Sequence, residues 1–207
     1  MKGINAISNA IYSNSPSWLC TANNESYIIL NKDSTSQEVD LFILGLFCYN
    51  SITFTDNSKE SFRNLIEMFS IDRVILSGGL MFYDGDTKIL PSCCAGLEQW
   101  AEAVDNISHQ NSPWLGHDPY PNIEYKDNSA IVWSDDYLGL FGLPKPKDEL
   151  QSIEFTNDEL NHSIAQLKTD ISEFISIPFC SRLKEIDNSI VDSLTSAALK
   201  WLGLIKK

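Results

Sequence analysis

Two adjacent cysteines and a histidine–aspartate pair are the residues of this sequence whose types suit covalent catalysis. Cys93 and Cys94 follow shortly after Pro91, and His117 and Asp118 come later, in a loop rich in Gly and Pro. A thiolate acts as a nucleophile when an imidazole takes the thiol proton and a carboxylate orients the imidazole. If a helix begins at Pro91, its N-terminus also lowers the pKa of a nearby thiol. These residues give the hypothesis of a cysteine-dependent enzyme that uses Cys93 or Cys94 with His117.

Packing is the competing interpretation of the two cysteines, and we favour it because Cys is among the most frequently buried residue types. A zinc site would join His109 and His117 to Cys93 and Cys94. Adjacent thiols do not easily reach one tetrahedral zinc ion, however, and the sequence lacks the spaced cysteine pair of a zinc finger. The Gly-Gly pair of the chain lacks the spacing of a phosphate-binding loop. We therefore predict no catalytic residue, no metal ligand and no cofactor.

Net charge indicates a different kind of site. The chain has 15 Lys and Arg against 28 Asp and Glu, a net charge of -13, which repels nucleic acid and acidic membrane surfaces. Ten acidic residues and three lysines fall between Asp118 and Glu159, so this stretch alone carries a charge of -7. A solvated surface that keeps the protein in solution is one explanation. The alternative is a docking face for a basic protein. We predict that neither nucleic acid nor a membrane is a ligand.

Aromatic residues lie among these carboxylates. Tyr and Trp supply rigid contact area at protein interfaces, so their mixture with carboxylates is typical of a surface that binds a basic protein. We predict a partner-binding surface with several carboxylate contacts and an aromatic anchor. Its candidate residues are Asp118, Glu124, Asp127, Asp135, Asp136, Trp114 and Tyr137.

The spacing of apolar residues predicts the elements that must position these side chains. Helices are expected over residues 5–20, 58–69, 91–104, 157–174 and 183–201, and strands over 27–30 and 73–76. Residues 38–49 are apolar nearly all round, and their length favours a buried helix over a buried strand. Two hairpins are expected, one over residues 80–89 with its turn at Asp84-Gly85 and one over residues 122–133.

Local signals refine this layout. Thr156-Asn157-Asp158-Glu159 has the form of a capping box, which predicts a helix start. Pro178 is expected to interrupt the helices that follow. We predict an α+β fold with a small, mostly antiparallel sheet packed with helices and a helical C-terminal third. Residues 1–207 are expected to form a single domain, with a mixed part over 1–138, a loop over 139–150 and packed helices over 151–207.

The chain has the features of a cytoplasmic protein. No apolar stretch near the N-terminus resembles a signal peptide core. The longest apolar run, Leu41–Tyr49, is about half of what a membrane-spanning helix needs. Five cysteines, an odd number with one adjacent pair, do not form a disulfide framework and suit a reducing compartment.

The sequence also resembles a family of uncharacterised bacterial proteins. The resemblance rests on two blocks, LPSCCAGLEQW over residues 90–100 and SPWLGHDP over residues 112–119, and covers roughly residues 60–135. It implies no particular chemistry. In type, as a small acidic protein without catalytic motifs, the chain is similar to the immunity proteins that bacteria pair with secreted nuclease toxins.

That second resemblance implies a function. A nuclease toxin is basic around its active site, so an inhibitor docks there with carboxylates in place of phosphates. The first hypothesis is therefore an immunity-type protein, not an enzyme, that binds and neutralises a basic toxin through its acidic surface. The alternatives are the cysteine-dependent enzyme and another protein-interaction module.

Overall fold

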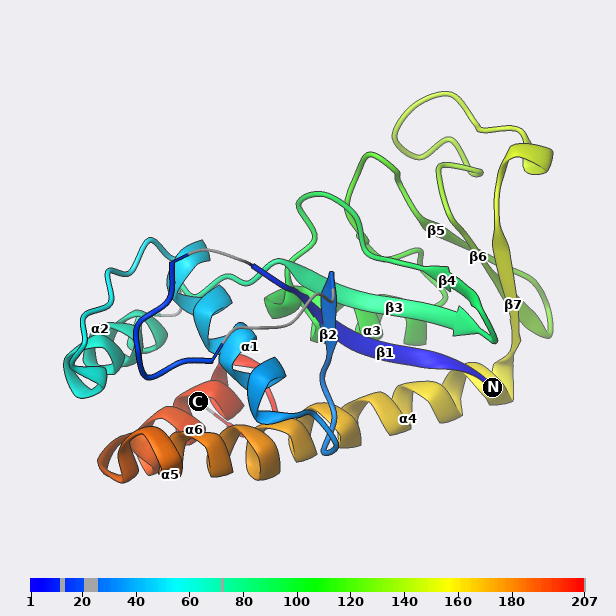
Figure 1. Cartoon of the computed structure of the whole chain (residues 1–207). Helices are drawn as coiled ribbons and strands as arrows, with labels where there is room; N and C mark the ends of the chain where they lie inside the picture. The colour runs from blue at the N-terminus through cyan, green and yellow to red at the C-terminus, as the bar shows by residue number, and fades with distance from the viewer. Residues whose placement is uncertain (12–13, 21–25, 72, 207) are drawn as a thin grey trace. The chain divides into compact units, whose positions relative to one another are not determined.

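The computed structural model describes residues 1–11, 14–20, 26–71 and 73–206 (Figure 1). The fold is α+β, as predicted, with α-helices and two small antiparallel sheets. The chain divides into two compact units. The first unit holds Met1–Ala6 and Gly78–Lys168, and the second holds Ile7–Ser77 and Thr169–Lys207. These limits differ from the division expected at residues 139–150, and the single domain expected from chain length stays a prediction.

A three-stranded antiparallel sheet forms one part of the first unit. Its strands are β5 (Asn122–Tyr125), β6 (Ser129–Trp133) and β7 (Ser152–Thr156), in the order β5-β6-β7. Tyr125 pairs with Ala130, which confirms the predicted hairpin around residues 126–129. Along β7, Ile153 and Phe155 are buried, whereas Ser152, Glu154 and Thr156 are exposed. This alternation is expected of a strand with one buried face.

The second predicted hairpin is also present in this unit. It consists of β3 (Gly78–Asp84) and β4 (Thr87–Ile89). Asp84 pairs with Thr87, so the two turn residues are Gly85 and Asp86, one position later than predicted. Gly85 has a φ of 58°, which glycine adopts without steric cost in a two-residue turn. The rings of Phe82 and Phe155 meet edge to face at 6.2 Å and join this hairpin to β7.

The helix predicted over residues 5–20 is wrong. Residues Lys2–Asn9 form strand β1, and the described residues that follow, 10, 11 and 14–20, contain no helix. Residues 2–6 of this strand belong to the first unit, where β1 lies beside β3. In the second unit, Ile7 pairs with Ile29 of β2 (Tyr27–Ile29). Asn and Ser are weak helix formers, so pairing with neighbouring strands decides the conformation.

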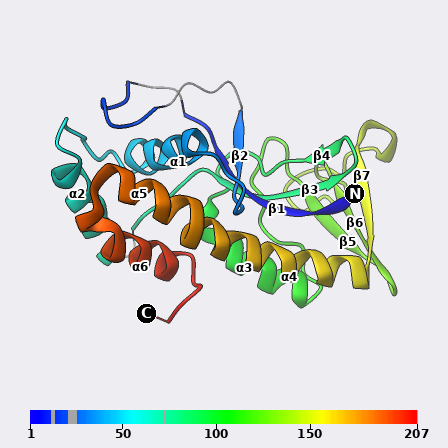
Figure 2. The ribbon, with the colours of Figure 1, turned by 60° about the horizontal axis from the view of Figure 1, so that its bottom comes forward.

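Helices dominate the second unit. They are α1 (Ser36–Tyr49), α2 (Ser58–Ser70), the end of α4 (Asn157–Phe174), α5 (Cys180–Asp187) and α6 (Val191–Trp201). Figures 1 and 2 both show α5 and α6 side by side. Every residue of α1 from Val39 to Phe47 is buried, which confirms the buried helix expected there.

Residues 73–76, predicted as a strand, have no regular structure. The side chain of Asn50 accounts for this difference. Its Oδ1 accepts a hydrogen bond from the backbone N–H of Ile75 at 2.9 Å, and its Nδ2 donates to the carbonyl of Ile75 at 2.8 Å. The amide thus supplies the two backbone hydrogen bonds that a neighbouring strand would give.

The C-terminal helices follow the prediction at their start and differ later. Thr156 and Glu159 form the expected capping box, with each backbone N–H bonded to the other side chain. Pro178 lies in a π-helical turn, Ile175–Phe179, that continues α4 into α5 without a break. The single helix expected over residues 183–201 is two helices separated by the short turn Asn188–Ile190. Among the described residues, none of the helices is both long enough and apolar enough to cross a membrane.

Candidate functional site

The structure of the first unit brings the two adjacent cysteines together with the histidine predicted from the sequence. One ligand atom from each of Cys93, Cys94 and His117 lies within 4.8 Å of the others. The two Sγ atoms are 3.4 Å apart, and both cysteines are exposed. His109 lies outside this group, at the end of helix α3 (Trp100–Ser108). Packing in the core, the interpretation favoured for the cysteines, is therefore wrong.

Backbone pairing between two loops positions these side chains. The N–H of Ser92 donates to the carbonyl of Leu115 at 2.8 Å, and the N–H of His117 donates to the carbonyl of Cys93 at 2.9 Å. Gly116 lies between them with a φ of 96°, and a Cβ there would approach the carbonyl oxygens of Ser92 and Cys93 at 2.6 Å. Glycine is therefore required for the two loops to meet this closely.

The helix predicted to begin at Pro91 starts later, with a 3-10 turn at Leu97–Gln99 followed by α3. The thiols therefore lie outside a helix N-terminus, so the helix effect expected to activate them does not apply. The hydrogen bond of the Cys93 thiol to Cys94, followed by repulsion from negative charge on Cys94, raises the pKa of Cys93. A raised pKa disfavours the thiolate form of Cys93.

A loop of the same unit, residues 136–145, contains a different arrangement, which we call the Asp136 loop. The carboxylate of Asp136 accepts hydrogen bonds from the backbone N–H groups of Leu140, Phe141 and Gly142 at 2.7 to 2.9 Å. Its backbone carbonyl accepts a bond from Lys145 at 2.8 Å and so closes the neck of the loop. One buried side chain therefore fixes the path of an exposed segment.

Hydrogen bonds also determine the ionisation of Asp136. Burial alone would raise the pKa of this carboxyl, but the backbone N–H groups of the loop outweigh burial and lower the pKa below its usual value. The side chain of Asn122 adds a further bond to Oδ1 at 3.1 Å. Asp136 is thus a carboxylate at neutral pH, held by uncharged donors.

The Asp136 loop presents apolar side chains to solvent. Leu140 is 54% exposed, Phe141 64% and Leu143 89%. The ring of Phe141 stacks on Tyr120 at 5.3 Å with an interplanar angle of 11°. Tyr120 in turn meets Trp114 edge to face at 5.6 Å. A row of aromatic rings therefore continues from the loop across the neighbouring surface.

A groove of about 400 Å³ lies against this loop. Asp118 and Asp135 line it together with Phe141, Leu143 and Lys145, whose Nζ lies 4.0 Å from Oδ2 of Asp135. The side chain of Asp118 is 90% exposed, whereas Asp135 accepts a bond from the backbone N–H of Tyr120 at 2.8 Å. The groove thus combines carboxylates with apolar surface, as a site for a basic side chain would.

The seven predicted contact residues fall into separate places. Asp118, Asp135 and Asp136 line the groove, and Trp114 belongs to the aromatic row beside it. Glu124 accepts a bond from the indole N–H of Trp133, and Tyr137 stacks on that ring at 4.1 Å. Asp127 is exposed in the turn between β5 and β6. Asp136 needs a correction, because its buried carboxylate is occupied by the loop and cannot contact a partner.

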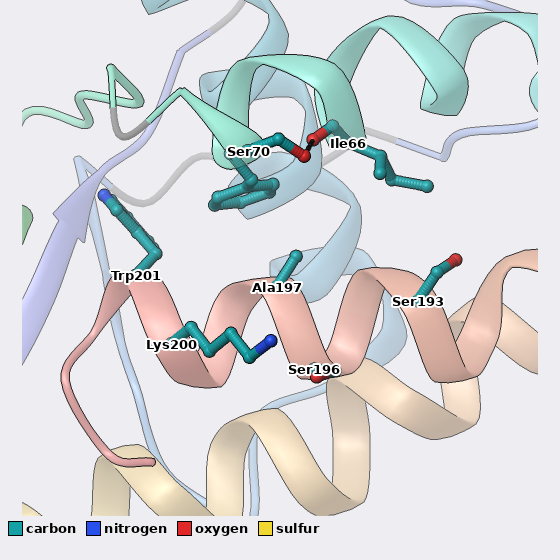
Figure 3. Close-up of a pocket in the computed structure, with 8 residues that line it drawn as sticks. Ile66, Ser70, Ser193, Ser196, Ala197, Lys200 and Trp201 are labelled. Atoms are coloured by element: carbon teal, nitrogen blue, oxygen red, sulfur yellow. Dashed lines mark hydrogen bonds between the residues drawn. The ribbon is translucent and has the colours of Figure 1, made fainter. Parts of the chain in front are cut away.

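A second groove, of about 580 Å³, lies in the other unit between α2 and α6 (Figure 3). Ile66, Phe69 and Trp201 give it apolar surface, and Lys200 is its one cation among the described lining residues. Within that part of the lining there is no carboxylate, thiol or imidazole. Three serines, Ser70, Ser193 and Ser196, complete its polar lining.

No family model, curated protein or solved structure matches this chain. The function is therefore inferred from the geometry of the first unit. The exposed apolar residues of the Asp136 loop are not among the contact residues predicted from the sequence. Their signal in the sequence is the run Leu138-Gly139-Leu140-Phe141-Gly142-Leu143-Pro144, in which large apolar residues fill a segment rich in Gly and Pro.

Proposed function

We propose that this protein binds a basic protein partner through the surface around the Asp136 loop. The docking surface is formed by Trp114, Asp118, Tyr120, Asp135, Phe141 and Leu143. The observation that carries the proposal is that a buried carboxylate fixes a loop whose Phe141 and Leu143 are 64% and 89% exposed. Exposed apolar residues on a rigid segment bind at low entropic cost, because the segment is ordered before the partner arrives.

The negative charge of the chain supports a basic partner. The chain carries a net charge of -13, and the docking surface combines its apolar centre with the carboxylates of Asp118 and Asp135. Complementary charge speeds association with a basic protein and repels an acidic one. A lysine or arginine side chain that enters the groove would meet Asp118 beside the aromatic rings and would compete with Lys145 for Asp135.

The specific role that fits this chemistry is that of a cytoplasmic immunity-type protein, one that neutralises a basic toxin, such as a nuclease, by covering its active site. Carboxylates on the docking surface take the place of substrate phosphates. This role needs no catalysis by the protein itself. Its support is the small size, the acidic charge and the rigid apolar loop.

The test uses the purified products of the genes adjacent to the gene of this protein. We expect a basic product to bind, with a dissociation constant that rises as salt is added. Phe141→Ser combined with Leu143→Ser should weaken binding by about 30-fold or more, the effect of losing a central apolar contact. Asp118→Asn should slow association and leave dissociation nearly unchanged.

The matched control is Ile71→Ser, which changes an apolar residue 52% exposed in the second unit. Its binding should equal that of the wild type. Equal loss in the control and in the loop variant would contradict the docking surface. Binding of an acidic product, or of no adjacent product, would contradict the toxin-neutralising role.

A further inference from the structure

We infer that Cys93, Cys94 and His117 form a binding site for a zinc ion, next to the docking surface that contains Asp118 and Phe141. The three residues offer two sulfur atoms and one imidazole nitrogen, all within 4.8 Å of one another. Two thiolates and an imidazole are ligands that zinc prefers. From the sequence, adjacent thiols were not expected to reach one tetrahedral zinc ion easily.

The backbone conformation overcomes that objection. Cys94 has a φ of 67°, a left-handed conformation that residues other than Gly, Asn and Asp seldom adopt. In an extended strand, successive side chains point to opposite faces. Here the turn at Cys94 brings its Sγ to within 3.4 Å of the Sγ of Cys93. A strained conformation that places two reactive groups together is typical of a functional site.

The separations are close to those of a tetrahedral zinc site. With Zn–S bonds of about 2.3 Å, two ligating sulfur atoms lie about 3.8 Å apart, a few tenths of an ångström more than the observed 3.4 Å. An imidazole nitrogen and a sulfur lie about 3.6 Å apart in such a site. The limit of 4.8 Å in this structure therefore requires a side-chain shift of about 1 Å at most. Rotation about the χ angles of two exposed cysteines provides this movement.

The surroundings of His117 orient its ring. Nδ1 lies 3.4 Å from the carboxylate of Asp118, and the ring stacks on Phe141 at 5.9 Å with an interplanar angle of 11°. A hydrogen bond from Nδ1–H to a carboxylate selects the tautomer in which Nε2 has a free lone pair. This carboxylate–histidine pairing is the usual outer shell of a zinc-bound histidine.

The ligand set also selects the metal. Magnesium and calcium bind oxygen ligands, whereas sulfur and imidazole favour zinc. Zinc binding would ionise both thiols and release their two protons to the buffer, so the site needs no thiolate in the free protein. Three protein ligands leave the fourth position of the tetrahedron for a water molecule.

The test is a zinc titration of the full chain, freed of metal and kept reduced with a phosphine. Competition with a chromogenic chelator measures stoichiometry and affinity. We expect one zinc ion per wild-type chain, about 100-fold weaker binding in Cys93→Ser, Cys94→Ser and His117→Gln, and roughly 10-fold weaker binding in Asp118→Asn. Cobalt as a probe should give a thiolate charge-transfer band that each cysteine substitution reduces.

The matched control is Cys20→Ser, which removes an exposed cysteine of the second unit and should leave the titration unchanged. Circular dichroism of each metal-free variant checks that the fold persists, so loss of binding reports on the ligand alone. Absence of zinc binding in the reduced wild type would overturn the inference. So would unchanged affinity in Cys93→Ser, equal loss in Cys20→Ser, or a cobalt spectrum without the thiolate band.

Discussion

Among the described residues, each unit buries one aspartate, and the two units hold it by different means. Asp40 of the second unit is 1% exposed and forms a salt bridge with Arg182. Asp136 of the first unit is 4% exposed and is held by backbone N–H groups. A carboxylate paired with a cation joins distant parts of the chain, whereas one held by consecutive N–H groups shapes a single loop. The buried Asp40 therefore stabilises the packing of its unit, whereas the buried Asp136 fixes the conformation of a surface loop.

The contacts of Asp40 show its role in the fold. Arg182 donates from Nε to Oδ1 at 2.7 Å and from Nη2 to Oδ2 at 2.9 Å, the two-pronged geometry that makes such pairs strong. The backbone N–H of Cys20 donates to Oδ2 at 2.7 Å, and Nη2 also reaches the carbonyl of Trp18 at 3.0 Å. The bond to Asp40, opposed in part by burial, raises the pKa of Arg182. Helices α1 and α5 and the segment before α1 thus meet at one carboxylate.

The largest effect is expected from Arg182→Met, which leaves Asp40 as a buried charge without its cation. The free energy of unfolding should fall by about 3 kcal/mol, because a buried ion that loses its partner is strongly destabilising. Urea denaturation followed by circular dichroism measures this. The control is Glu185→Gln, which removes the 59% exposed partner of the same arginine and should cost about 0.5 kcal/mol or less. Similar losses in both variants would show that burial of Asp40 is not the cause.

The next effect is expected from Asp136→Asn, which removes the charge and replaces one acceptor oxygen by a donor. Loss of the charge-assisted bonds should cost about 2 kcal/mol and open the loop locally. Amide hydrogen exchange at Leu140, Phe141 and Gly142 should therefore quicken by roughly 30-fold. Asp127→Asn, an exposed change in the same unit, should leave these amides unaffected. A fall in global stability as large as that of Arg182→Met would refute the contrast between the two aspartates.

Acid should also open the Asp136 loop, as Asp136→Asn is expected to do. The carboxyl has a lowered pKa in the folded protein, so the stability that it contributes is complete above its unfolded pKa of about 3.9. That stability is lost as the pH falls through the folded pKa, which lies below 3.8. Exchange of the loop amides, corrected for intrinsic rates, should be unchanged from pH 7 to about pH 4.5 and accelerate below that range. In Asp136→Asn this pH dependence should disappear.

Local signals in the sequence predicted much of the fold. The capping box at Thr156 and the hairpin of β3 and β4 depend on a few neighbouring residues, so the sequence predicted both, with the hairpin turn one position off. The incorrect predictions concern segments whose conformation depends on residues far away in the sequence. Residues 2–9 become a strand because other strands lie beside them, and Ile75 bonds to the side chain of Asn50 in place of a strand.

The candidate site follows the same rule. Asp118 and Trp114 were predicted as contact residues, and they lie in or beside the groove because both belong to one loop. Asp136 was misjudged, because the sequence does not show that its carboxylate turns inward to the following N–H groups. The meeting of Cys93 with His117 depends on pairing across 24 residues and on the tight approach at Gly116. Such contacts are determined by tertiary structure and not by local spacing.

The smallest effect is expected from removing a helix cap, a feature that both units contain. Thr35 caps α1 and Thr156 caps α4, and each forms the same reciprocal box with a glutamate three residues later. Thr35→Ala and Thr156→Ala should each reduce the free energy of unfolding by about 1 kcal/mol, the usual value of such a cap. Chemical denaturation of the two variants, with Ser substitutions as controls that retain the hydroxyl, measures both losses. If both variants lose the same free energy of unfolding, the two units differ in their buried aspartates and not in their helix caps. A much larger loss at one threonine would show that the helices of the two units depend on capping to different degrees.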